Sequence, residues 1–284
     1  MKAYAFPVLV VAATLLAGCP LNPGGLEDSN DSAAPSPQPK MPGWEEADPN
    51  AAGKARRYRL IVTVRLTTVE VPVGTASGSE EIWSYLDEEP VRTVGSGSLG
   101  RNGLRVGLGR TGSWPDLARV LKRMTGRSPR QQLVAATPGD PLPVVLKERQ
   151  DVGTIFTFHD DRTLTGRDYP PGDYVLAMAC TLNEDDLSRI LITAVPQVRT
   201  TRRQPGFEMG VKGPAMTLRA EVFNFTPLTF QLEVPAKGFL VVGPGANARN
   251  PSSVGHHFLV RKKEGMEFET LLVLHPEVLA APLK

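Results

Sequence analysis

The stretch YRLIVTVRLTTVEVPV, residues 58–73, alternates apolar and polar side chains as a β-strand does. Neighbouring side chains of a strand point to opposite faces, so the even-numbered apolar residues of its first half share one face. From Val69 onward the apolar residues are odd-numbered instead. Because a change of phase by one residue exchanges the two faces, it predicts a β-bulge, or a bend between two strands, at Thr67 and Thr68.

The residues that follow this strand predict two helices and three further strands. The clearest helix runs from Ser113, which can cap its N-terminus, to Thr125. Its apolar residues recur at helical spacing: Leu117, Val120, Leu121 and Met124. The other predicted elements are a helix over 77–86 and strands over 89–94, 104–108 and 131–135. Residues 56–136 are therefore predicted to form a small α+β module.

A break in this pattern separates the module from the rest of the chain. The stretch TPGDPLP, residues 137–143, is rich in proline and contains a glycine, which is typical of a boundary. After it, apolar residues recur mostly with a period of two, most clearly over 216–222 and 228–234, and the segments 239–242 and 268–274 predict two more strands. The segments 174–182 and 187–198 are more uniformly apolar and are joined by a polar turn over 183–186, so they predict a central hairpin. The predicted fold class is α+β, a small N-terminal module followed by an antiparallel β-rich domain over residues 144–284.

The N-terminal residues have the pattern of a secretion signal. Lys2 precedes an apolar run, Val8–Leu16, that is too short to span a membrane, and the run ends in Leu-Ala-Gly-Cys at Cys19. This segment resembles the lipobox of bacterial lipoproteins as a class. The resemblance implies a signal peptide over residues 1–18, acylation of Cys19, and a lipid-anchored place in the cell envelope facing the periplasm, with the outer membrane favoured over the inner. An ordinary secretory signal with an incidental cysteine is the alternative.

The next segment, residues 19–55, is predicted to be a disordered tether behind the acylated cysteine. It is rich in Pro, Gly, Ser, Asn and Asp and has almost no large apolar residues. Acidic residues outnumber basic ones in it, which leaves the body of the chain mildly basic although the formal net charge is only +2. That imbalance is too weak to predict nucleic-acid binding. With Cys19 acylated, Cys180 has no partner for an internal disulfide, and its apolar neighbours predict a buried thiol.

No motif predicts a catalytic, cofactor-binding or metal-binding residue. The stretch GSGSLG, residues 95–100, has the glycine spacing of a dinucleotide-binding loop but leads into a predicted strand instead of a helix. His256 and His257 are neighbours on a predicted strand, where their side chains would point to opposite faces. The triplet His159-Asp160-Asp161 is typical of a polar turn, with a metal site as the alternative.

Basic residues gather on and just after the second predicted helix. They are Arg119, Lys122, Arg123, Arg127 and Arg130. Such a cluster could contact anionic lipid headgroups or an acidic partner. The alternative is that these side chains form the solvated face of a helix.

Three stretches of the C-terminal half resemble the end of bacterial secretins, the ring-forming channels of envelope secretion systems. They are FQLEVPAKGFLVVGPG at 230–245, SVGHHFL at 253–259 and ETLLVLHPEV at 269–278. Residues 56–136 resemble the small periplasmic α+β modules of the same family. No paired-glycine gate hairpin and no amphipathic membrane hairpin accompany these motifs. The resemblance implies self-assembly or a place in a secretion complex.

These observations predict a lipid-anchored envelope protein with a structural or protein-binding role. Self-assembly, or pairing with another envelope protein, would use exposed strand edges. Neither a cofactor nor a nucleic-acid partner is expected. Two alternatives stay open. A small-ligand receptor would need an apolar pocket near residues 137–143. An envelope hydrolase would need a cleft in which the candidate polar residues converge: His159, Asp160, His256 or Cys180.

Overall fold

The computed structural model describes residues 58–93, 98–125, 129–182, 186, 188–210, 213–235 and 237–282. The signal peptide, the lipidation site Cys19 and the tether predicted over residues 1–55 lie outside these ranges. Residues 54–284 form one compact unit. The unit is rich in β-strands, and its sheets are antiparallel, as predicted.

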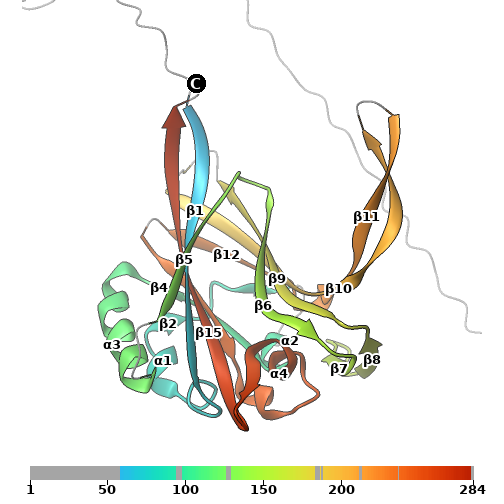
Figure 1. Ribbon diagram of the computed structural model, residues 1–284. Coiled ribbons are helices and arrows are strands. Elements are labelled where there is room, and N and C mark those ends of the chain that lie inside the picture. Colours follow the sequence, from blue (N-terminus) through green and yellow to red (C-terminus); the bar gives the residue numbers. More distant parts are fainter. Residues whose placement is uncertain are drawn as a thin grey trace, which may run out of the picture. The chain divides into compact units, whose positions relative to one another are not determined.

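The larger sheet, sheet A, is built around two long strands that pair along their whole shared length (Figure 1). These strands run antiparallel, from Tyr58 opposite Pro282 to Pro72 opposite Phe268. The strand order is β2 (Leu86–Asp87), β4 (Leu104–Gly109), β13 (Phe239–Pro244), β15 (Met266–Pro282), β1 (Tyr58–Pro72) and β5 (Arg130–Ala136), and β14 (Val260–Lys263) also pairs with β15.

The smaller sheet, sheet B, packs over one face of sheet A. Its strand order is β3 (Arg92–Thr93), β12 (Phe230–Pro235), β10 (Arg189–Gly210), β9 (Gly172–Leu182) and β6 (Pro141–Gln150), and β11 (Gly213–Asn224) also pairs with β10. The predicted central hairpin is confirmed, because β9 and β10 pair from Leu182 opposite Ile190 onward. Side chains of both sheets form the main apolar core between them, among them Val64, Leu176, Ile192, Leu232 and Leu274.

Helices cover the other face of sheet A. They are α1 (Glu80–Trp83) and α3 (Trp114–Thr125), and α3 is preceded by the 3-10 turn η1 (Thr111–Ser113). The predicted helix over 113–125 is therefore confirmed, and its apolar stripe enters a second core with Val241 and Leu271 of the sheet. The helix predicted over 77–86 is shorter than expected, since Ser79 accepts the backbone N–H of Ile82 and starts the helix at Glu80.

The change of phase in β1 has a different cause from the one predicted. The pairing of β1 with β15 has no register shift, so there is neither a bulge nor a break at Thr67 and Thr68. Val62, Val64 and Leu66 face sheet B and belong to the main core, whereas Val69 and Val71 face the helices and belong to the second core. One regular strand thus supplies apolar side chains to opposite faces in its two halves.

The strands do not divide between residues 56–136 and 144–284 as two separate domains would. β1 pairs with β15 and β4 pairs with β13, so both ranges build sheet A and both of its cores. The predicted boundary at 137–143 is a short connection, 137–140, from β5, an edge of sheet A, to β6, an edge of sheet B, which already begins at Pro141. The physical reason is that strand pairing satisfies backbone hydrogen bonds between segments far apart in sequence, which a local change in composition does not report.

The remaining elements close the ends of the two sheets. Strands β7 (Gly153–Phe158) and β8 (Leu164–Tyr169) form a hairpin, and α2 (Ser98–Arg101), α4 (Val254–Leu259), η2 (Thr226–Leu228) and η3 (Ala246–Arg249) are short helical turns. Strands β10 and β11 continue beyond β9 as a two-stranded arm (Figure 1). The alternation in β11 predicted a strand correctly, but Met216 and Leu218 are exposed on the arm.

Candidate functional site

The edge of sheet A formed by β5 is open. This seven-residue strand, RQQLVAA, pairs with β1 on one side and with no described strand on the other. Its side chains are mostly exposed, and Leu133 is 67% exposed. Arg130 is its only charged residue. Such an edge offers a row of backbone N–H and C=O groups to another strand.

The neighbouring edge of sheet B is protected against the same kind of pairing. Pro141 and Pro143 stand in β6 and have no backbone N–H to donate. The pairing of β6 with β9 is also irregular after Val145, which bends such an edge away from a regular ladder. The chain thus protects β6 with proline and leaves β5 without a comparable device.

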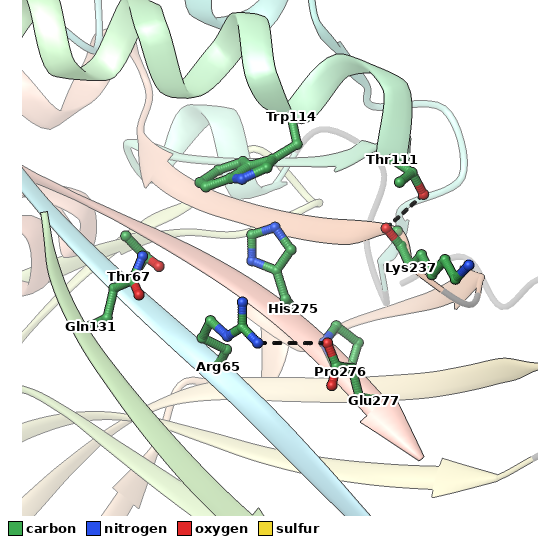
Figure 2. A pocket seen from close by; sticks show the side chains of 10 residues that line it. Arg65, Thr67, Thr111, Trp114, Gln131, Lys237, His275, Pro276 and Glu277 are labelled. Carbon is green, nitrogen blue, oxygen red and sulfur yellow. Dashed lines mark hydrogen bonds and ion pairs between the residues drawn. The ribbon is translucent and has the colours of Figure 1, made fainter. Parts of the chain in front are cut away.

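A pocket of about 180 Å³ lies beside β5, where the first turn of α3 leaves the face of sheet A (Figure 2). Three strands supply one row of side chains across this face, because Leu133 of β5 lies opposite Arg65 of β1, and Arg65 lies opposite His275 of β15. The lining residues are Arg65, Thr67, Thr111, Trp114, Gln131, Lys237, Gly238, His275, Pro276 and Glu277.

His275 forms the wall of the pocket beneath Trp114 (Figure 2). The ring centroids of His275 and Trp114 are 4.5 Å apart in an edge-to-face arrangement, and Phe239 lies 5.2 Å away on the core side. Both ring nitrogens of His275 are buried and have no hydrogen-bond partner among the described residues. Burial lowers the pKa of this imidazole, Arg65 lowers it further and Glu277 opposes the shift, so the surroundings favour the neutral ring.

Polar groups surround the ring. Thr67 is 1% exposed, and its Oγ1 finds no partner within the described part of the chain. The Arg65 guanidinium lies 3.9 Å from the Glu277 carboxylate, which is too long for a hydrogen bond, and both side chains are about half exposed. Thr111 Oγ1 donates to the backbone carbonyl of Lys237 at 2.7 Å, which connects the turn before α3 to the start of β13.

The predicted basic cluster is partly neutralised. Arg119 pairs with Asp116 at 2.8 Å, and Arg123 pairs with Glu81 of α1 at 2.5 Å. Lys122 is exposed on α3, Arg130 begins β5, and Arg127 lies outside the described residues. Arg119 and Arg123 therefore form ion pairs with acidic side chains, which reduces the positive potential that the cluster could present to an anionic surface.

The histidine pair lies on a helix, so its predicted place on a strand is wrong. Ser253 caps α4 by accepting the backbone N–H of His256, and the turn continues to Leu259. His256 Nδ1 lies 3.0 Å from the carbonyl oxygen of Ala248. The His257 ring packs on Tyr174, and burial lowers its pKa to about 4, with Lys147 and His256 adding to the shift. Both rings therefore support the packing of α4.

The other candidates for chemistry have structural partners. His159 Nε2 lies 2.6 Å from Thr165 Oγ1 in the β7–β8 hairpin, and Asp161 accepts the backbone N–H of Thr163 in the turn. Cys180 is 1% exposed in the main core, and burial raises the pKa of its thiol to about 11. Within the described ranges, no three His, Cys, Asp or Glu residues are placed to hold a metal ion.

Sequence reasoning missed the pocket, although its residues carry a recognisable signal. Val69 and Val71 of β1 form part of the apolar face that α3 covers. The preceding residues on the same face of the strand, Arg65 and Thr67, are polar. On β15 the pattern likewise passes from Leu271 and Val273 to His275 and Glu277, which share one face of the strand. Where two paired strands change from apolar to polar side chains on the same face, the helix that covers that face ends.

Two further observations bear on function. No helix of the described residues is long and apolar enough to cross a membrane. Comparison of the sequence with protein-family models and with curated proteins gives no match.

Proposed function

We propose that this chain is a lipid-anchored component of a bacterial cell envelope with a structural, protein-binding role, and that it pairs with a second copy of itself through β5. The observation that carries the proposal is the open, nearly uncharged edge of sheet A beside the proline-protected edge of sheet B. The lipobox ending in Cys19 supports the anchor, and the proposal places the chain on the periplasmic side, at the outer membrane.

The sequence of β5 suits antiparallel pairing with its own copy. Pairing centred on Leu133 sets Arg130 opposite Ala136 and Gln131 opposite Ala135, so the two arginines stand at opposite ends. Leu133 then meets the same residue of the second copy, which adds an apolar cross-strand pair. Pro129 and Pro138 flank the strand and limit the pairing to this segment.

An edge of this length gives a weak interface in solution. The lipid anchor compensates, because copies held on one membrane meet at a high effective concentration. We therefore expect a monomer–dimer equilibrium for residues 54–284, with a Kd on the order of 10–100 µM. A larger discrete oligomer would favour the assembly implied by the resemblance to secretins.

Leu133→Lys is expected to raise the dimer Kd about tenfold or more, because two like charges would stand opposite each other. Sedimentation equilibrium of residues 54–284 over a range of concentrations measures the change. Val145→Lys is the matched control, since Val145 is 47% exposed on the protected edge β6, and its Kd should equal that of the wild type. A chain that stays monomeric at every concentration, or equal effects of the two variants, would contradict pairing through β5.

Cys19→Ser is expected to abolish acylation and to move the protein out of the membrane fraction, because no other side chain near the lipobox can carry the thioether. The full chain is expressed in a bacterial host supplied with labelled palmitate, and label and fractionation are both measured. Cys180→Ala serves as the control and should keep the label and the membrane location. Label that survives Cys19→Ser would refute the anchor.

A further inference from the structure

We propose that the pocket between Trp114, Thr67 and His275 binds a small monocarboxylate whose carboxylate faces Arg65. This binding activity lies within one copy of the chain and is independent of pairing through β5. The site is built from the interior of the sheet, because Thr67 is 1% exposed and its Oγ1 has no partner in the described ranges. The His275 ring lines the same space, although its two nitrogens are themselves buried.

The groups around the pocket are mostly hydrogen-bond donors. The half-exposed Arg65 guanidinium brings a positive charge and the amide of Gln131 adds a neutral donor, whereas the Lys237 side chain extends away from the pocket (Figure 2). A carboxylate has two oxygens that can accept from several of these groups at once, and hydrogen bonds to a charged acceptor are the stronger kind.

Glu277 sets the charge of the ligand. Its carboxylate lies 3.9 Å from the Arg65 guanidinium, close enough to attract it but without a hydrogen bond. The guanidinium therefore keeps its donors for a ligand, while the negative charge beside it disfavours a dianion such as phosphate.

The apolar walls set the size of the ligand. Trp114 covers the His275 ring, so this side of the pocket accepts a short hydrocarbon group. A volume of about 180 Å³ holds a group of a few carbon atoms and excludes a drug-sized ligand. The chemistry fits a free short-chain acid and equally the carboxyl terminus of a peptide.

The test is a titration of residues 54–284 with sodium butyrate at constant ionic strength, followed by NMR of the tryptophan indoles and histidine rings. Saturable shifts are expected at Trp114 and His275, with a Kd on the order of 1 mM, and none at Trp83, which is buried at the end of α1. Acetyl-Ala-Ala and inorganic phosphate are titrated in parallel. Tighter binding of the peptide would identify a peptide carboxyl terminus as the source, and tighter binding of butyrate a free acid.

Three variants make the result specific. Arg65→Gln should weaken butyrate binding about tenfold or more, and Glu277→Gln should strengthen it several-fold, because the two charges act on the ligand with opposite sign. Arg59 lies on the same strand and face but does not line the pocket, so Arg59→Gln should leave the Kd for butyrate unchanged. Shifts that do not saturate, phosphate binding tighter than either carboxylate, or equal effects of Arg65→Gln and Arg59→Gln would overturn the assignment.

Discussion

Glu269→Ala is expected to lower the free energy of unfolding of residues 54–284 by about 4 kcal/mol, since three backbone donors would lose a charged acceptor. The Glu269 side chain is 0% exposed. Its carboxylate accepts the backbone N–H of Gly74 at 2.9 Å, of Ala76 at 2.8 Å and of Ser77 at 2.9 Å. These bonds fix the turn between β1 and α1, so their loss also loosens the helix that covers the second core.

Urea denaturation measures this effect, and Glu70→Ala is the matched control. Glu70 lies on the paired strand β1 and forms exposed ion pairs with Lys263 and Arg261, so its loss should cost no more than about 1 kcal/mol. Glu269→Gln should fall between the two, because an amide can accept at one side only. A Glu269→Ala midpoint equal to that of Glu70→Ala would show that the three bonds contribute little.

Lys147→Met is expected to raise the free energy of unfolding at pH 7 by about 3 kcal/mol and to change it little near pH 10.5, because the buried ammonium is a cost in the folded state. Lys147 is 8% exposed, and its Nζ donates to the His256 carbonyl at 3.2 Å. Burial lowers the pKa of Lys147 from 10.5 to about 7, Arg261 lowers it further, and Glu267 opposes the shift.

The sign of the pH dependence follows from these two pKa values. Between about pH 7 and pH 10.5 the unfolded chain binds the proton and the folded chain releases it, so wild-type stability rises with pH across this window. Below pH 7 both states carry the charge and the full cost is present. Unfolding of the wild type, Lys147→Met and the exposed control Lys262→Met is compared at pH 6, 7, 9 and 10.5. If Lys147→Met destabilises the chain at every pH, the ammonium is not a cost.

The local sequence pattern was sufficient to predict the elements whose burial is the same along their whole length. The spacing of Leu117, Val120 and Leu121 predicted α3, which buries one face. Two more uniformly apolar segments joined by a polar turn predicted the β9–β10 hairpin in the interior of sheet B. The pattern of β1 was harder to interpret. Its two halves bury opposite faces, and a bulge would leave the same pattern in the sequence.

What the sequence determined by itself is the periodicity of each segment, and with it the β-rich, antiparallel character of the chain. Periodicity depends only on neighbouring residues and on the geometry of a strand or helix. Only the tertiary structure decided that β1 pairs with β15, that β5 is left at an open edge, and that His275 meets Trp114. Those contacts join residues far apart in the chain, and the free energy that selects them comes from burying both faces of sheet A at once.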